Sequence, residues 1–174
     1  MQSIKRIFKA GRGPSSSHTI APELAGKLFL KKLAQKPSKI LIHLYGSLAT
    51  TGKGHHTDRI LLDTFRNIPV DILWHFDKNL PKHPNGMEFE AFDQNDKLLA
   101  NWRVYSIGGG QLADDNGIID NSATVSYPAE YFSDIIKWCD KNRQPIWQFT
   151  YQNDEKDLQE FLDYIWGVME QAIW

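Results

Sequence analysis

The chain has 174 residues, which is enough for one domain of ordinary size with a buried core. Its 20 basic and 21 acidic side chains nearly cancel, so its charge gives no reason to expect a nucleic acid or an anionic membrane as a partner. No apolar run approaches the roughly 20 residues of a membrane-spanning helix, and no apolar stretch of an export signal follows the basic N-terminus, so we expect a cytoplasmic protein.

The first notable stretch is GPSSSHT at 13–19, which precedes a predicted helix over 20–35 whose apolar residues recur at helical spacing. The first N–H groups of a helix lack internal partners and carry roughly half a positive charge, which favours a carboxylate or a phosphate. Serine and threonine hydroxyls add donors. The His18 imidazole titrates near neutrality, so it could exchange protons with the bound group. The alternative is an ordinary serine-rich helix cap.

A second loop-to-helix junction follows the next predicted strand. Residues 39–45 are apolar and bounded by turn residues, which predicts a buried strand. The segment 46–54 is a loop rich in glycine and hydroxyl residues, and a helix is expected from about 55 to 66. The Gly-x-x-x-x-Gly-Lys-Ser/Thr order of a nucleotide-binding loop is missing, so no nucleotide is expected here.

The middle of the chain predicts paired strands. Residues 69–84 are expected to be an irregular connecting loop, because aromatic residues and prolines interrupt them. The Asn-Gly pair at 85–86 precedes the alternating segment 87–92, which predicts an antiparallel pair with 98–107. Gly108, Gly109 and Gly110 follow, and such glycines let the backbone approach another chain or a ligand closely. The alternative is a flexible tip.

The last part of the chain predicts helices over 131–142 and 155–172, a strand over 146–151 and a weak edge strand over 124–127. The terminal helix would expose a large apolar surface unless it folds back or meets a partner. Cys139 is expected in the core. As the one cysteine, it can form neither an internal disulfide nor an iron–sulfur cluster alone.

Together these elements predict an α/β (α+β) fold, a mixed sheet of about four to five strands with helices packed on it. No metal site is expected, because His55 and His56 are adjacent and lack the spacing of a helical ligand pair. A serine hydrolase built on Ser16, His18 and Asp58 would lack the Gly-x-Ser-x-Gly turn. What remains is a polar anion-binding site where the two loop-to-helix junctions converge.

Four stretches are long and unusual in composition: GPSSSHT at 13–19, YGSLATTGKGHHTD at 45–58, NLPKHPNGM at 79–87 and YSIGGG at 105–110. In order and spacing they resemble the beta domain (beta chain) of bacterial iron-sulfur-dependent L-serine dehydratases. The resemblance implies that 1–153 is this beta domain and that the helix at 154–174 leads towards a catalytic alpha domain, which is absent here. It also implies an L-serine ammonia-lyase, which converts L-serine to pyruvate and ammonia. The 4Fe-4S cluster would lie in the alpha domain, so this chain alone is expected to bind no cofactor and to be inactive.

For the site, the resemblance implies that these loops face the cluster domain and help to close the substrate site. Removing water from L-serine requires an anchored carboxylate and abstraction of the α proton. His18 and His56 are the candidate catalytic residues, and which one is the base stays open. The candidate substrate-binding residues are Ser15, Ser16, Ser17, Thr19, Lys53, His55, Thr57, Asn85 and Gly86. The expected partners are the iron–sulfur catalytic domain or subunit, L-serine and a second copy of the chain.

The beta domain also resembles the allosteric substrate-binding domain of some phosphoglycerate dehydrogenases, which binds a ligand without chemistry. This gives a second hypothesis: a non-catalytic domain that senses an anion or L-serine and regulates or assembles the enzyme. The two hypotheses differ in whether His18 and His56 change turnover, or only the apparent affinity and activation.

Overall fold

The computed structural model describes residues 3–119, 125 and 127–174. The chain forms two compact units, Gly11–Asp120 and Met1–Ala10 with Asn121–Trp174, and each is described by itself. Among the described residues, no helix combines the length and the apolar character that crossing a membrane requires.

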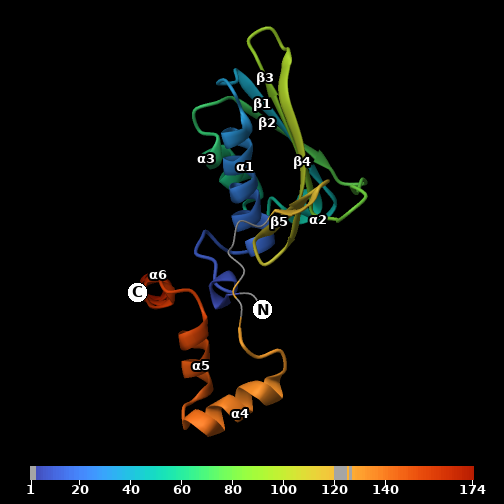
Figure 1. The fold of residues 1–174 in the computed structure, drawn as a ribbon. Coiled ribbons are helices and arrows are strands. Elements are labelled where there is room, and N and C mark those ends of the chain that lie inside the picture. Colours follow the sequence, from blue (N-terminus) through green and yellow to red (C-terminus); the bar gives the residue numbers. More distant parts are fainter. Residues whose placement is uncertain (1–2, 120–124, 126) are drawn as a thin grey trace. The chain divides into compact units, whose positions relative to one another are not determined.

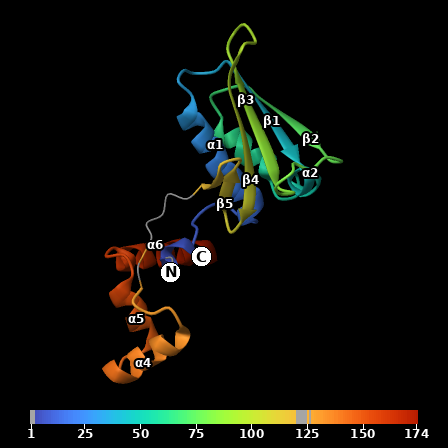
Figure 2. The same ribbon diagram turned by 45° about the vertical axis from the view of Figure 1, so that its right-hand side comes forward.

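The larger unit is a sheet with helices on one face (Figures 1 and 2). Its strands are β1 (Lys39–Tyr45), β2 (Val70–His75), β3 (Gly86–Phe92), β4 (Leu98–Gly108), β5 (Gln111–Asp114) and β6 (Gly117–Ile119). Its helices are η2 (Ser16–Ile20), α1 (Ala21–Lys32), α2 (Gly46–Thr51) and α3 (Thr57–Thr64). The strand order is β2-β1-β3-β4-β5-β6, with β1 and β2 parallel and the other neighbours antiparallel. The expected mixed α/β sheet is confirmed, with six strands instead of four or five.

The core of this unit lies between the sheet and α1. Alternate residues of β1 and every fourth residue of α1 are fully buried: Ile40, Ile42, Leu44, Ala21, Ala25 and Phe29. These two spacings place one face of the strand against one stripe of the helix. Gly26 lets α1 lie close to α3, because a Cβ there would be 2.9 Å from the Thr64 side chain. Helices α1 and α3 are therefore closely packed against each other on this face of the sheet.

Two segments of this unit differ from the sequence predictions. The prediction of an irregular loop over 69–84 is wrong for the first part of this segment. That part forms β2, which pairs in parallel with β1. Alternate residues of β2, from Val70 to Trp74, pack against the core, and the prolines lie outside the strand. The loop expected over 46–54 begins as helix α2, and the β5–β6 hairpin was not expected.

The smaller unit is helical. Its helices are η1 (Ile4–Arg6), α4 (Phe132–Asn142), α5 (Ile146–Asn153) and α6 (Leu158–Ile173). The helices expected over 131–142 and 155–172 are confirmed as α4 and α6. Lys5 joins η1 to the chain before α6, because its Nζ lies 3.0 Å from Glu155 Oε2 and 2.7 Å from Asp157 Oδ1.

The prediction of a strand over 146–151 is wrong, because these residues belong to α5. The helix begins directly after Pro145, and Phe149 is buried, with its ring edge-on to Trp138 of α4 at 5.2 Å between centroids. Cys139 is half-buried on α4 and does not occupy the core position expected for it. The edge strand expected over 124–127 falls partly outside the described residues.

Candidate functional site

The candidate site lies at the end of β1, where the chain turns sharply into α2 (Figure 2). Gly46 makes this turn with a positive φ of 51°. A Cβ on Gly46 would lie 2.2 Å from Asn79 Oδ1 and 2.3 Å from the Pro84 carbonyl oxygen, so only glycine fits. The turn places α2 at the carboxyl end of the parallel strands β1 and β2, where open α/β sheets commonly bind ligands.

The serine-rich stretch at 13–19 forms the start of a helix beside α2. The turn η2 has π-helical geometry and continues directly into α1. The N–H groups of His18 and Thr19 both donate to the Ser15 carbonyl, at 3.2 and 2.8 Å. Within the part of the chain that the structure describes, the N–H groups of Ser16 and Ser17 have no acceptor. Two donors at the positive end of a helix therefore remain for a ligand, and π-helical turns are frequent at functional sites.

The imidazole of His18 is surrounded by four hydroxyl groups from two helical segments. Its Nδ1 lies 2.9 Å from Ser17 Oγ and 3.3 Å from Ser15 Oγ. Its Nε2 lies 3.0 Å from Thr51 Oγ1 and 3.4 Å from Ser47 Oγ. The whole residue is only 7% exposed. Both ring nitrogens therefore have hydroxyl partners, which hold the imidazole in one orientation.

His55 packs against His18 and affects its protonation. The two ring centroids are 4.6 Å apart, and His55 Nδ1 donates to the Thr51 carbonyl oxygen at 3.0 Å. Burial lowers the pKa of His18, and the neighbouring His55 lowers it further, against a smaller opposite effect of Ser47. His18 is therefore mainly neutral at pH 7, so one of its ring nitrogens carries no proton.

Two sequence-predicted hydroxyls hold the backbone of the site. Thr19 Oγ1 donates to the carbonyl oxygens of Ser15 and Arg12. Thr57 Oγ1, at the start of α3, donates to the His18 carbonyl oxygen at 2.7 Å. Both threonines are fully buried. Because their protons are engaged and their side chains are buried, these threonines hold the backbone around His18 in place.

Lys53 and His56 lie near the second junction without joining the His18 cluster. The Lys53 ammonium lies 5.5 Å from the centre of the Trp74 ring, a cation–π contact. His56 has a left-handed backbone with a φ of 61° directly before α3, and its side chain is exposed. Among the described residues, no hydrogen bond or ring contact joins either side chain to His18. The structure thus brings together the side chains of Ser15, Ser17, His18 and His55.

The predicted residues Asn85 and Gly86 lie where β3 begins. The Asn85 N–H donates to His83 Nδ1 at 3.1 Å. A Cβ on Gly86 would lie 2.6 Å from Leu80 Cδ1, so this glycine lets the preceding loop pack on the strand. Gly86 therefore has a packing role at the start of β3.

The three glycines at 108–110 form the turn between β4 and β5. Their φ values of 104°, 57° and 74° lie in the region that favours glycine, which explains their identity. A Cβ on Gly108 or Gly109 would meet nothing within 4 Å. The close approach of a ligand or another chain at this turn stays a prediction.

Ser47 and Thr51 were missed as site residues, although both lie in a motif that the sequence singled out. They are four residues apart, so both point from one side of α2 towards His18. The available signal was this spacing. The spacing is that of a helix, whereas the glycine and hydroxyl residues of 46–54 predict a loop.

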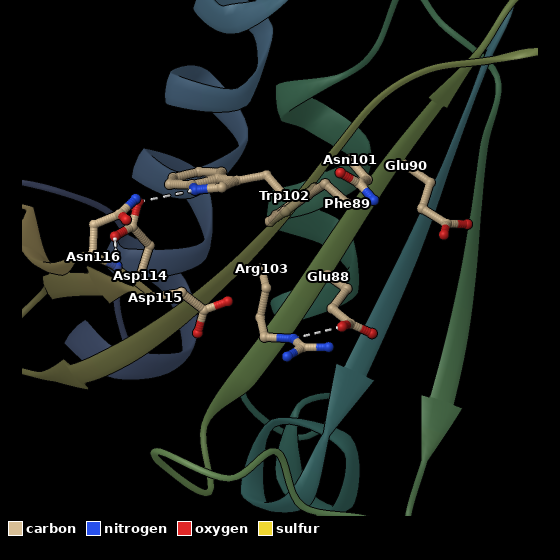
Figure 3. A pocket seen from close by; sticks show the side chains of 9 residues that line it. All are labelled: Glu88, Phe89, Glu90, Asn101, Trp102, Arg103, Asp114, Asp115 and Asn116. Atoms are coloured by element: carbon tan, nitrogen blue, oxygen red, sulfur yellow. Dashed lines mark hydrogen bonds and ion pairs between the residues drawn. The ribbon is translucent and has the colours of Figure 1, made fainter.

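A separate pocket of about 390 Å³ lies over β3, β4 and the turn after β5 (Figure 3). It is lined by Glu88, Phe89, Glu90, Asn101, Trp102, Arg103, Asp114, Asp115 and Asn116. Arg103 Nε donates to Glu88 Oε1 at 2.7 Å, and Trp102 Nε1 donates to Asp114 Oδ2 at 3.3 Å. The Arg103–Glu88 pair neutralises one of the four carboxylates that line the pocket. None of the sequence-predicted site residues lines this pocket, so the His18 cluster remains the candidate site.

The donor set of this chain does not fit a four-iron cluster. Such clusters are normally held by several cysteine thiolates, and the sequence contains one cysteine. In the described ranges, no three histidine, cysteine, aspartate or glutamate side chains come together as metal ligands. Any cluster that works with this chain must therefore be held by other residues.

Comparison with known proteins gives a consistent result. The family model described as "Serine dehydratase beta chain" matches residues 3–68 and 63–117. L-serine dehydratase 1 and L-serine dehydratase 2 of Escherichia coli (strain K12) are 30% and 32% identical, with 99% of this chain and 48% of each relative covered. The L-serine dehydratase of Haemophilus influenzae is 28% identical, with 99% and 49% covered. The chain thus spans about half the length of the curated relatives it matches. Because the family model covers most of the chain, including the His18 cluster, the chain belongs to the serine dehydratase beta chain family.

Proposed function

We propose that this chain is the beta domain or subunit of an L-serine ammonia-lyase, which converts L-serine to pyruvate and ammonia. In this proposal it supplies the loops that bind the substrate carboxylate, and an iron–sulfur catalytic domain or subunit completes the site. The observation that carries the proposal is the buried His18 imidazole, held among four hydroxyls at a helix start with two unpaired N–H groups. Relatives named L-serine dehydratase, of which this chain matches half, support it.

The residues of this chain suit two parts of the reaction. The N–H groups of Ser16 and Ser17, with the nearby serine hydroxyls, are placed to hold a carboxylate at the positive end of η2 and α1. His18 is mainly neutral at pH 7, as a general base must be before it removes the α proton. Departure of the β hydroxyl is assigned to the cluster-bearing partner, because the donors of this chain do not fit a cluster.

Between the two candidate bases, we assign proton transfer to His18. Its ring is buried, positioned by hydrogen bonds to both nitrogens and beside the free helix N–H groups. His56 is exposed and is not held in one orientation by described residues. A base must be fixed near the proton it removes, so the geometry favours His18.

The decisive experiment is steady-state kinetics of His18→Asn in the assembled dehydratase. Loss of a general base typically lowers the rate by about 10²- to 10⁴-fold, so kcat should fall by that order with the cluster content intact. His43→Gln is the matched control, because His43 lies on β1 and pairs with His75 of β2, outside the His18 cluster. An unchanged kcat in His18→Asn would contradict the proposal.

The second candidate function is a domain that senses an anion or L-serine and regulates or assembles its partner. The engagement of Thr19 and Thr57 with backbone carbonyls favours it, because these hydroxyls build a rigid binding site and need no chemistry. The same kinetics separate the two functions. A sensor predicts that His18→Asn shifts the apparent affinity or the activation, while kcat at saturation is unchanged.

A further inference from the structure

Two buried oxygen atoms near the candidate site have no protein partner. Ser106 of β4 is 0% exposed, and within the described part of the chain its Oγ has no hydrogen bond. The same holds for the buried Oδ1 of Asn85, directly before β3. Buried polar atoms in native proteins nearly always have a partner, so an unpaired pair calls for a ligand or an ordered water.

The strand register places these two side chains next to each other. Met87 lies opposite Val104 and Gly86 opposite Tyr105 in the antiparallel pair β3–β4. The Ser106 N–H donates to the Asn85 carbonyl at 2.9 Å, so the pairing continues by one residue. Opposite residues of an antiparallel pair have their side chains on the same face, with Cβ atoms about 5 Å apart.

The same register shows which face this is. Met87 and Val104 belong to the core beneath α1, and side chains two residues along a strand share a face. Asn85 and Ser106 therefore project from the sheet on the side of α1, and β4 also contacts η2. The two unpaired oxygens lie on the side of the sheet that carries His18.

A chain of hydrogen bonds connects this pair to the His18 cluster. Ser47 Oγ lies 3.4 Å from His18 Nε2, and the Ser47 N–H donates to the Pro84 carbonyl at 3.2 Å. Asn85 follows Pro84 directly and holds Ser106 through its own carbonyl. Ser47 thus connects the helix start with the segment that leads into β3.

We propose that Asn85 and Ser106 form the subsite for the α-ammonium group of the bound amino acid. In this subsite the hydroxyl of Ser106 distinguishes an amino acid from a hydroxy acid that lacks the amine. This rests on the proposed function, in which the carboxylate binds the N–H groups of Ser16 and Ser17. An amide oxygen accepts hydrogen bonds and a hydroxyl can do so, which suits an ammonium group with three donors. The positive helix end repels a cation and attracts the carboxylate, so the zwitterion has one favoured orientation.

The test is a calorimetric titration of the whole chain with two probes, L-serine and 3-hydroxypropanoate. The second probe keeps the carboxylate and the hydroxyl but lacks the amine. Ser106→Ala and Asn85→Ala should each weaken L-serine binding at least about tenfold, as expected for a lost hydrogen bond to a charged group, and leave 3-hydroxypropanoate binding unchanged. Ser38→Ala is the control, because Ser38 Oγ donates to the Phe92 carbonyl at the other end of the strands.

Each other outcome has a definite meaning. If the variants weaken both probes equally, or neither, the ammonium subsite is wrong while the carboxylate site stands. If the wild-type chain binds neither probe, the carboxylate site of the proposed function fails, and the subsite fails with it. The melting temperature gives an independent check, since removing an unpaired buried hydroxyl should not lower it. A lower melting temperature for Ser106→Ala with unchanged L-serine binding would show a purely structural hydroxyl and would overturn the inference.

Discussion

Thr51 contacts His18 across two helical segments, with 3.0 Å between Thr51 Oγ1 and His18 Nε2. His18 lies on η2, before the sheet begins, and Thr51 ends α2, after the first strand. The contact joins the two loop-to-helix junctions, so the orientation of the imidazole depends on both. This relationship makes the position of the His18 ring depend on a residue outside its own helix.

Thr51→Val should reduce turnover of the assembled enzyme through His18. One hydrogen bond is worth about 1 kcal/mol, so we expect kcat to fall roughly fivefold. Thr50→Val is a close control, since both threonines donate to carbonyls within α2 but only Thr51 hydrogen-bonds to His18 among these two described residues. Steady-state kinetics would refute the role of Thr51 if both variants lost the same activity.

The pKa of His18, which burial and His55 lower, predicts how stability depends on pH. A histidine with a lowered pKa binds fewer protons in the folded chain than in the unfolded chain. The contribution of His18 to the free energy of unfolding is therefore full at a pH above 6.5, the ordinary pKa of histidine, and is lost as the pH falls below that value. Urea unfolding should show that the free energy of unfolding falls more between pH 8 and pH 5 for the wild type than for His18→Asn. Equal losses would contradict a depressed pKa.

Gly46→Ala should strongly destabilise the larger unit. The new Cβ would meet Asn79 Oδ1 and the Pro84 carbonyl oxygen at 2.2 and 2.3 Å, and the residue would keep an unfavourable positive φ. We expect a loss of about 2–4 kcal/mol in the free energy of unfolding, measured with urea. Gly54→Ala is the control, because its Cβ would find ordinary space, with the nearest atom at 3.4 Å. Similar stabilities for the two variants would refute the steric argument.

The two compact units should differ in hydrogen exchange. Helix α4 has no buried residue, and few side chains of the smaller unit are buried, whereas β1 and β3 contribute wholly buried residues to the core of the larger unit. Local opening follows the number of buried apolar contacts, so amides of α4 should exchange faster than those of β1 and β3. Mass spectrometry of deuterated peptides measures this. Equal protection of α4 and β1 would contradict the prediction.

The isolated chain should neither acquire an iron–sulfur cluster nor convert L-serine. One thiol is too few for a cluster, and in the proposed function the partner supplies it. After anaerobic treatment with iron and sulfide, we expect no cluster absorption and no pyruvate. Cys139→Ala is the matched control for iron bound adventitiously. Stoichiometric cluster together with pyruvate formation by the wild-type chain would show that the argument from the thiol count is wrong.

Elements with a local apolar period could be predicted from the sequence. Helix α1 and strands β1, β3 and β4 carry the spacing of their own secondary structure. Strand β2 could not be recognised, because Leu73 and Asp71 share its outward face and blur the alternation of apolar and polar residues. Its place depends on parallel pairing with β1, which no local pattern shows. Helix α5 is rich in residues that favour strands, and the packing of Phe149 decides its structure.

The contacts of the candidate site also divide into those that local sequence predicts and those that depend on the folded sheet. The proximity of Ser15, Ser17 and His18 follows from neighbouring positions in one helical turn, so the sequence predicted it. The approach of Ser47 and Thr51 depends on the sharp turn at Gly46, which sets the direction of α2. The pairing of Asn85 with Ser106 depends on strand register, which is settled only when the sheet forms.

The strand order β2-β1-β3-β4 also has a consequence for the sequence of events during folding. The groups of the proposed substrate site come from parts of the larger unit that are far apart in sequence, from η2 before β1 and from the end of β4. Contacts of such large sequence separation form slowly, because closing a long loop costs chain entropy before any stabilising contact is made. A nascent chain exposes its serine-rich loop long before the β4 residues that complete the site have been synthesised. In refolding experiments, affinity for L-serine should therefore return together with the sheet signal and later than the helical signal.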